Sequence, residues 1–197
     1  MRLSAVSALA LFDEANRQDP CHEKDEAGTE YPRELLYSMR MTARLLALCP
    51  AAGEALQLAV RAQHLKRWTL QRNRWPMDRE GYLRWRTALR DFHADEASRL
   101  MRQAGCPEDL IQRTASLIRK ERLKLDQESQ LLEDTACLVF LQHYFLPFAL
   151  KHPPDKVSQI VRKTWFKMGE LGRREAQCLD LPEAAKKILL TALNTLS

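Results

Sequence analysis

The 197-residue sequence has few of the residues that interrupt regular structure, with six glycines and nine prolines. This scarcity argues against collagen-like chains, Gly-rich linkers and turn-rich all-β folds. No run of about 18 apolar residues occurs, so we expect no membrane-spanning helix. The longest apolar run, Cys137–Leu150, is interrupted by Gln142, His143 and Pro147. The five cysteines are widely spaced without a C-x-x-C pair, which argues against a disulfide framework and a structural zinc site.

Hydrophobic residues make up 45% of the chain, which argues against intrinsic disorder of the whole chain. The length favours one domain covering residues 1–197. The beginning of the chain, Arg2 followed by Leu3–Phe12, resembles a secretory signal. Cleavage after Ala10 would leave almost no apolar segment before it, whereas such signals run about 15–30 residues. We therefore interpret this segment as the first helix of a cytoplasmic protein.

Apolar residues recur at helical spacing along most of the chain. No segment shows convincing strand alternation bounded by hairpin turns. We therefore predict an all-α fold, a compact single-domain bundle of about eight helices, with loops at 19–31 and 69–77. The predicted helices cover residues 4–16, 32–48, 52–68, 78–104, 107–124 and 126–150, followed by two or three short helices in 155–196.

Several residues mark helix ends. Asp78 and Asp126 are typical N-caps, because a short carboxylate can accept hydrogen bonds from free backbone amides of the first turn. Gly105 is a typical stop after a long helix. The pair Pro153-Pro154 is expected to break the helix before it.

The basic residues are concentrated in the middle of the chain. Residues 61–124 contain sixteen Lys or Arg and eight Asp or Glu, whereas residues 13–34 contain eight acids and three bases. Such an excess suits an anionic ligand such as a phosphate ester, a nucleotide or RNA. It equally suits a set of solvated helix faces, and the sequence leaves both interpretations open.

Four polar residues fall on apolar stripes of the predicted helices, namely His64, His93, Glu121 and Asp134. His93, for example, follows Leu89 and precedes Ala97 at intervals of four. A carboxylate facing a helix seam must be paired, hydrogen-bonded or bound to a metal. Two imidazoles and two carboxylates pointing inward could form an N/O metal site. Each could also be an ordinary hydrogen-bonded core residue.

Three stretches of the chain resemble the HD-domain superfamily of metal-dependent phosphohydrolases, over about residues 32–150. Residues 59–67 (AVRAQHLKR) look like the helix with the His-Asp doublet, and His93 lies where many members have an additional His. Residues 117–121 (LIRKE) resemble the helix with another His, and residues 132–138 (LEDTACL) the one with the final Asp. The short helices at 153–196 would pack on this core.

The chain departs from the HD pattern at three positions. The Asp of the doublet is Leu65, Glu121 replaces a His, and the 32–48 helix has no His and only one carboxylate, Glu34. The resemblance implies that His64, His93 and Asp134 hold a divalent metal ion (Mn, Fe, Zn or Ni). It also implies Glu121 and Asp134 as catalytic residues. The whole chain is also similar to a family of conserved single-domain proteins with no assigned activity, which shares the stretches at 32–37, 61–64, 82–86 and 119–124.

Cations flank the predicted centre. Arg and aromatic residues alternate in 67–75 and 82–86, which suits nucleobase stacking beside phosphate contacts or Arg–Trp stacking within the fold. Together with these cations, the HD-domain resemblance implies a metal-dependent hydrolase of a phosphorylated small molecule or nucleotide. The alternative is a non-catalytic HD-like module that binds RNA, a nucleotide or a protein partner. The predicted phosphate-binding residues are Arg61, Lys66, Arg67, Arg84, Lys120 and Lys124.

Overall fold

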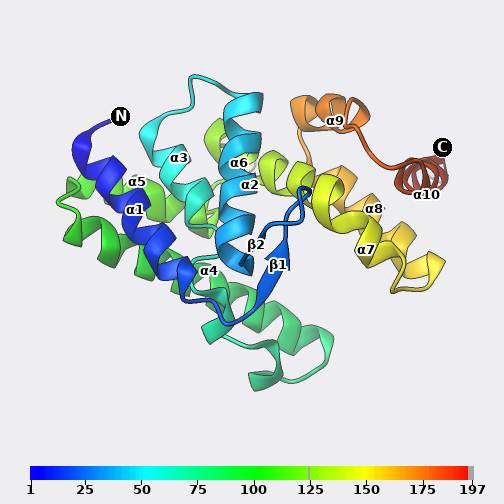
Figure 1. The fold of residues 1–197 in the computed structure, drawn as a ribbon, viewed down its shortest axis with the longest axis horizontal. Coiled ribbons are helices and arrows are strands. Elements are labelled where there is room, and N and C mark those ends of the chain that lie inside the picture. The colour runs from blue at the N-terminus through cyan, green and yellow to red at the C-terminus, as the bar shows by residue number, and fades with distance from the viewer. Residues whose placement is uncertain (124, 195–197) are drawn as a thin grey trace. The chain divides into compact units, whose positions relative to one another are not determined.

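The computed structural model describes residues 1–123 and 125–194, and these divide into two compact units (Figure 1). The first unit is Met1–Arg122 and the second is Leu123–Ser197. Ten α-helices and one pair of short strands lie in the described residues, so the all-α prediction is confirmed. The helix count exceeds the predicted eight. The boundary between the units falls inside the 32–150 segment, and the single-domain arrangement stays a prediction.

The first unit contains helices α1 to α5. Helix α1 lies against α2, α3 and α4, while α5 packs on both α3 and α4. Large side chains from each helix are fully or almost fully buried, so the unit has an apolar core of its own. The helices are α1 (Leu3–Arg17), α2 (Arg33–Leu48), α3 (Glu54–Arg61), α4 (Arg79–Gln103) and α5 (Glu108–Arg119).

The predicted start of α4 is confirmed. The Asp78 carboxylate accepts a hydrogen bond of 2.7 Å from the Gly81 amide, as an N-cap does. Gly81 is also tightly constrained, because a Cβ there would lie 2.1 Å from the Pro76 carbonyl oxygen. These two contacts fix the loop before α4 against the first turn of the helix.

The prediction of a plain loop at 19–31 is wrong. Strands β1 (His22–Lys24) and β2 (Glu30–Pro32) pair antiparallel there, with Glu23 opposite Tyr31. The connecting turn forms because Asp25 Oδ1 accepts the amides of Ala27 and Thr29 and because Gly28 adopts a φ of +85°. The strands are too short to show a period of two in the sequence.

The helix predicted over 52–68 ends earlier, at Arg61. The chain then forms a turn in which Lys66 has a left-handed φ of 51°, followed by a 3₁₀ turn at Arg67–Thr69. Asn16, which is fully buried, supports this turn: its Oδ1 accepts the Lys66 amide at 3.0 Å. The residues around His64 therefore lie on an irregular turn held against α1.

The second unit is also helical, and its first helix, α6, starts as predicted. The Asp126 carboxylate accepts the amides of Glu128 and Ser129. The long helix predicted over 126–150 is divided by a π-helical segment at Phe140–Tyr144. Helix α8 lies against α6, α7 and α10, and α9 lies against α6. The helices are α6 (Gln127–Val139), α7 (Phe145–Ala149), α8 (Pro154–Lys167), α9 (Glu170–Gln177) and α10 (Glu183–Asn194).

Among the helices in the described ranges, none is both long and apolar enough to cross a membrane.

Candidate functional site

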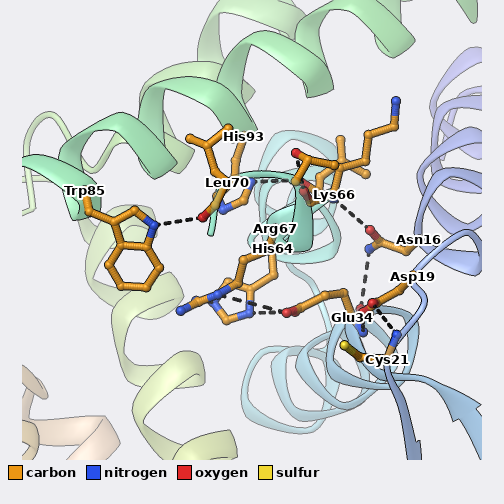
Figure 2. A network of polar contacts seen from close by, with 12 residues as sticks. Asn16, Asp19, Cys21, Glu34, His64, Lys66, Arg67, Leu70, Trp85 and His93 are labelled. Carbon is orange, nitrogen blue, oxygen red and sulfur yellow. Dashed lines mark hydrogen bonds and ion pairs between the residues drawn. The ribbon is translucent and has the colours of Figure 1, made fainter. Parts of the chain in front are cut away.

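His64 lies at the centre of a polar cluster in the first unit (Figure 2). Its Nδ1 is 3.0 Å from Glu34 Oε2, and its Nε2 is 3.0 Å from Arg67 Nη1. A guanidinium only donates hydrogen bonds, so Nε2 must be the acceptor and Nδ1 must carry the proton given to Glu34. This assigns His64 as a neutral imidazole in the Nδ1–H tautomer. We call Glu34, Tyr37, His64, Arg67, Arg86, His93 and Lys120 the His64 centre.

Glu34 is held in place through its backbone. It lies in the first turn of α2, where its amide donates to Asp19 Oδ2 at 3.0 Å and its carbonyl accepts from the buried Asn16. Burial raises the pKa of Glu34, and the positive charge of Arg67 opposes that rise. The carboxylate therefore depends on its two partners, His64 and Arg67, for compensation.

The His64 ring is fixed by stacking. The Tyr37 ring, one turn along α2 from Glu34, lies parallel to it with a centroid distance of 3.9 Å and an interplanar angle of 10°. Burial lowers the pKa of His64 well below its ordinary value, and the positive charges of Arg67, Arg86 and Lys120 lower it further. About one fifth of the His64 side chain stays exposed to solvent.

His93 on α4 is the second imidazole of the centre. Its Nδ1 donates to the Leu65 carbonyl oxygen at 2.8 Å, and its ring centroid is 6.1 Å from that of His64. His93 is 3% exposed, and its Nε2 has no hydrogen-bond partner among the described residues. Burial, together with His64, lowers the pKa of His93 to about 3. The site thus holds a second neutral imidazole with an unused lone pair.

Positive charge exceeds negative charge around these rings. The Arg67 guanidinium lies 4.0 Å from Glu34 Oε1 and over the Trp85 ring, 5.2 Å from its centroid. Trp85 is itself fixed, because its indole N–H donates to the Leu70 carbonyl oxygen (Figure 2). The Arg86 guanidinium has neither a hydrogen-bond nor an ion-pair partner in the part of the chain that the structure describes. Arg67, Arg86 and Lys120 all act electrostatically on the His64 ring, and Glu34 is the carboxylate bonded to it.

Other predicted phosphate-binding residues have structural partners. Arg61 makes a two-pronged ion pair with Asp13, with N–O distances of 2.6 and 2.7 Å. The Lys66 side chain extends away from His64 (Figure 2) and lies 3.2 Å from Glu96. Arg84 is exposed and paired with Glu80 one turn earlier on α4. Lys124 lies outside the described residues. Only Arg67 and Lys120 from that set belong to the centre.

Glu121 does not face inward as predicted. Helix α5 ends at Arg119 because Lys120 takes a left-handed φ of 58°, and Glu121 follows as an exposed residue. It lines a surface hollow that also includes the ion pairs Arg102–Glu108 and Arg119–Asp95. The stripe through Leu117 and Glu121 is therefore interrupted by the helix end.

Asp134 is buried, as its apolar stripe indicates, and lies in the second unit. Its Oδ1 accepts from the Gly169 amide and from Gln130 Nε2, both at 2.8 Å. A Cβ on Gly172 would lie 2.6 Å from Asp134 Cγ. Asp134 therefore caps the N-terminus of α9, a position that favours a negative charge. Its role as a metal ligand and catalytic residue stays a prediction.

No group of three or more His, Cys, Asp or Glu side chains in residues 1–123 and 125–194 is arranged to hold a metal ion. The sequence indicates His64 and His93, and it includes Arg86 among the candidate ligand contacts of the Arg–aromatic stretches, but it does not indicate Glu34 or Tyr37 as site residues. One feature of the sequence could have marked Glu34 as a candidate, because it is the single carboxylate of the predicted 32–48 helix. The contacts of Tyr37 and Arg86 depend on how α2 and α4 meet the turn after α3, which the sequence does not indicate.

The fold and the centre define an all-helical protein with a buried, cation-rich Glu–His–Arg cluster. The sequence profile of the family described as "Domain of unknown function (DUF4202)" matches residues 6–189, and the chain belongs to this family. No curated protein and no solved structure matches the chain.

Proposed function

We propose that the protein binds the phosphate group of a phosphorylated small molecule or nucleotide at the His64 centre. The observation that carries this proposal is the Arg86 guanidinium, which has no partner among the described residues and whose charge acts on both His64 and Arg67. Glu34 offsets the charge of Arg67, so the Arg86 guanidinium leaves a net positive charge at these residues, and the two imidazoles are neutral. Charge-assisted hydrogen bonds from Arg and Lys are the usual means of binding phosphate in proteins.

The site also suits a phosphate because its donors are held in place. Arg67 rests on Trp85 and Glu34, and Tyr37 fixes the His64 ring. A bound phosphate oxygen can take the Arg67 N–H that His64 Nε2 now accepts. Binding would then release a lone pair on His64 within the same site.

Calorimetric titration with inorganic phosphate and with AMP tests the proposal. Wild-type protein should bind at one site, and Arg86→Gln should weaken binding about tenfold or more, because one charge-assisted hydrogen bond contributes about 1.5–3 kcal/mol. Arg84→Gln is the matched control, since Arg84 is an exposed arginine of the same helix already paired with Glu80. Equal affinities for the three proteins would contradict the proposal.

Metal-dependent hydrolysis on an HD-like scaffold is the second candidate. It is supported by the unused Nε2 of His93 and by the 6.1 Å between the two imidazole centroids. His64, His93 and Glu34 would supply two nitrogens and one oxygen, ligand types that first-row divalent metals accept. These three side chains would have to rearrange, because no such group in the described residues is arranged to hold an ion. A bound ion would polarise a phosphoryl oxygen and acidify a water molecule. Arg67 now occupies His64 Nε2, so its guanidinium would have to move for His64 to coordinate through that atom.

Metal analysis after incubation with Mn, Fe, Zn or Ni separates the two candidates. Metal-dependent hydrolysis requires near-stoichiometric metal in the wild type that is lost in His93→Gln and kept in His22→Gln, a change at an exposed histidine of β1. If the protein binds phosphate but retains no metal, the hydrolase candidate is wrong and phosphate binding remains as the function of the centre.

A further inference from the structure

The outward face of α4 continues from the His64 centre and carries cations and an aromatic ring. Its residues recur at helical intervals of three and four, so they share one side of the helix. Tyr82 is 46% exposed and Leu83 is 55% exposed. We call this set the α4 face, and it consists of Arg79, Tyr82, Leu83, Arg86 and Arg90.

Arg86 connects this face to the centre. The Arg86 charge acts on both His64 and Arg67. The Tyr82 ring lies beside Trp85, with centroids 6.0 Å apart, and the Arg67 guanidinium lies over the same Trp85 ring. With a rise of about 1.5 Å per residue, Tyr82 lies roughly 6 Å and Arg79 roughly 10 Å along the axis from Arg86. A chain-like anion that begins at the centre would therefore meet an aromatic ring and then a second cation.

The side chains near this face, like those of the His64 centre, carry more positive than negative charge. Arg79 and Arg74 are exposed, and their guanidinium groups have no hydrogen-bond or ion-pair partner within residues 1–123 and 125–194. The acids close by are engaged: Glu80 pairs with Arg84, and Asp78 caps α4. An exposed aromatic ring between free guanidiniums suits a ligand that alternates flat bases with phosphates.

We infer that the ligand of the His64 centre is the terminal phosphate of a single-stranded nucleic acid, whose next nucleotides lie along the α4 face with a base stacked on Tyr82. This inference rests on the proposed function and specifies its ligand. The centre binds the terminal phosphate through Arg67 and Arg86. Arg79 contacts a phosphate within the strand.

Fluorescence anisotropy with labelled hexanucleotides tests this inference. RNA and DNA strands bearing a 5′-phosphate, a 3′-phosphate or neither phosphate are compared. At least one phosphorylated strand should bind more tightly than its unphosphorylated counterpart. If the protein neutralises two or three phosphates, the logarithm of the binding constant plotted against the logarithm of the salt concentration should have a slope of about −1.4 to −2.1.

Tyr82 variants separate stacking from charge. Tyr82→Ala should weaken binding of the phosphorylated hexanucleotide about 5- to 150-fold, as loss of one base–aromatic stack does, and leave the affinity for inorganic phosphate unchanged. Tyr82→Phe keeps the ring and should keep the affinity. Arg86→Gln should weaken both ligands, whereas Arg84→Gln should weaken neither.

Three results would overturn the inference. If wild-type protein binds inorganic phosphate but binds the hexanucleotides no better, the proposed function stands and this inference is wrong. If hexanucleotides bind without regard to a terminal phosphate and inorganic phosphate does not bind, the proposed function fails and the inference fails with it. Binding to vesicles of anionic lipid without binding to any hexanucleotide would assign the α4 face to a membrane surface instead.

Discussion

Acidification should destabilise the protein through His93, and the structure gives the size of the effect. The pKa of His93 is lowered to about 3, whereas an unfolded histidine titrates near 6.5. Between these values the unfolded chain binds more protons than the folded one, so stability is fully present above about pH 6.5 and decreases as the pH falls toward 3. From pH 7 to pH 5 the linkage relation gives a loss of about 2 kcal/mol from this one residue.

The substitution His93→Gln removes the titration and keeps an amide N–H that can donate to the Leu65 carbonyl. Urea unfolding at pH 7 and pH 5 should therefore show a pH dependence about 2 kcal/mol smaller in His93→Gln than in the wild type. Comparing the two proteins cancels the carboxylates that titrate in both. His22→Gln, at an exposed position, should leave the wild-type pH dependence intact. Equal pH dependence in wild type and His93→Gln would refute a buried, neutral His93.

Two further substitutions test the centre and the second unit. Glu34→Gln should cost about 2 kcal/mol in urea unfolding at pH 7, because it removes the negative charge that strengthens the hydrogen bond from His64 and compensates Arg67. Glu34→Gln should also tighten phosphate binding in calorimetry, since the competing anion is gone. Glu14→Gln is the control: Glu14 forms an exposed ion pair with Arg17, so this change should lower the free energy of unfolding by less than about 1 kcal/mol. Gly172→Ala should cost about 1–3 kcal/mol in thermal or urea unfolding, because its Cβ would lie 2.6 Å from Asp134 Cγ. Unchanged stability in Glu34→Gln or Gly172→Ala would contradict the contact concerned.

Sequence patterns predicted the features that depend on one helix at a time. Asp78 and Asp126 cap helices as expected because a cap is a local hydrogen bond to the next turn. His93 is buried because its neighbours at intervals of four form the core stripe of α4. These features follow from spacing alone.

The centre itself depends on contacts between elements. Residues 62–68 continue a helical pattern in the sequence, but Asn16 from α1 binds the Lys66 amide and supports a turn instead. That turn brings His64 to Glu34 of α2, thirty residues earlier in the chain. The prediction that Glu121 faces inward is wrong for a related reason. Lys120 adopts a left-handed conformation and ends α5 before Glu121 is reached. No single-helix pattern contains this information.

The most direct test of the central claim is a long-range ¹H–¹⁵N spectrum of the histidine side chains at pH 7 during titration with inorganic phosphate. Before phosphate is added, His64 and His93 should both show the neutral Nδ1–H tautomer. Phosphate should then shift the His64 and His93 resonances with one saturating curve, while His22 stays unchanged. Phosphate-induced shifts confined to the exposed His22, or no shift at His64 up to saturating concentrations, would contradict phosphate binding at the His64 centre.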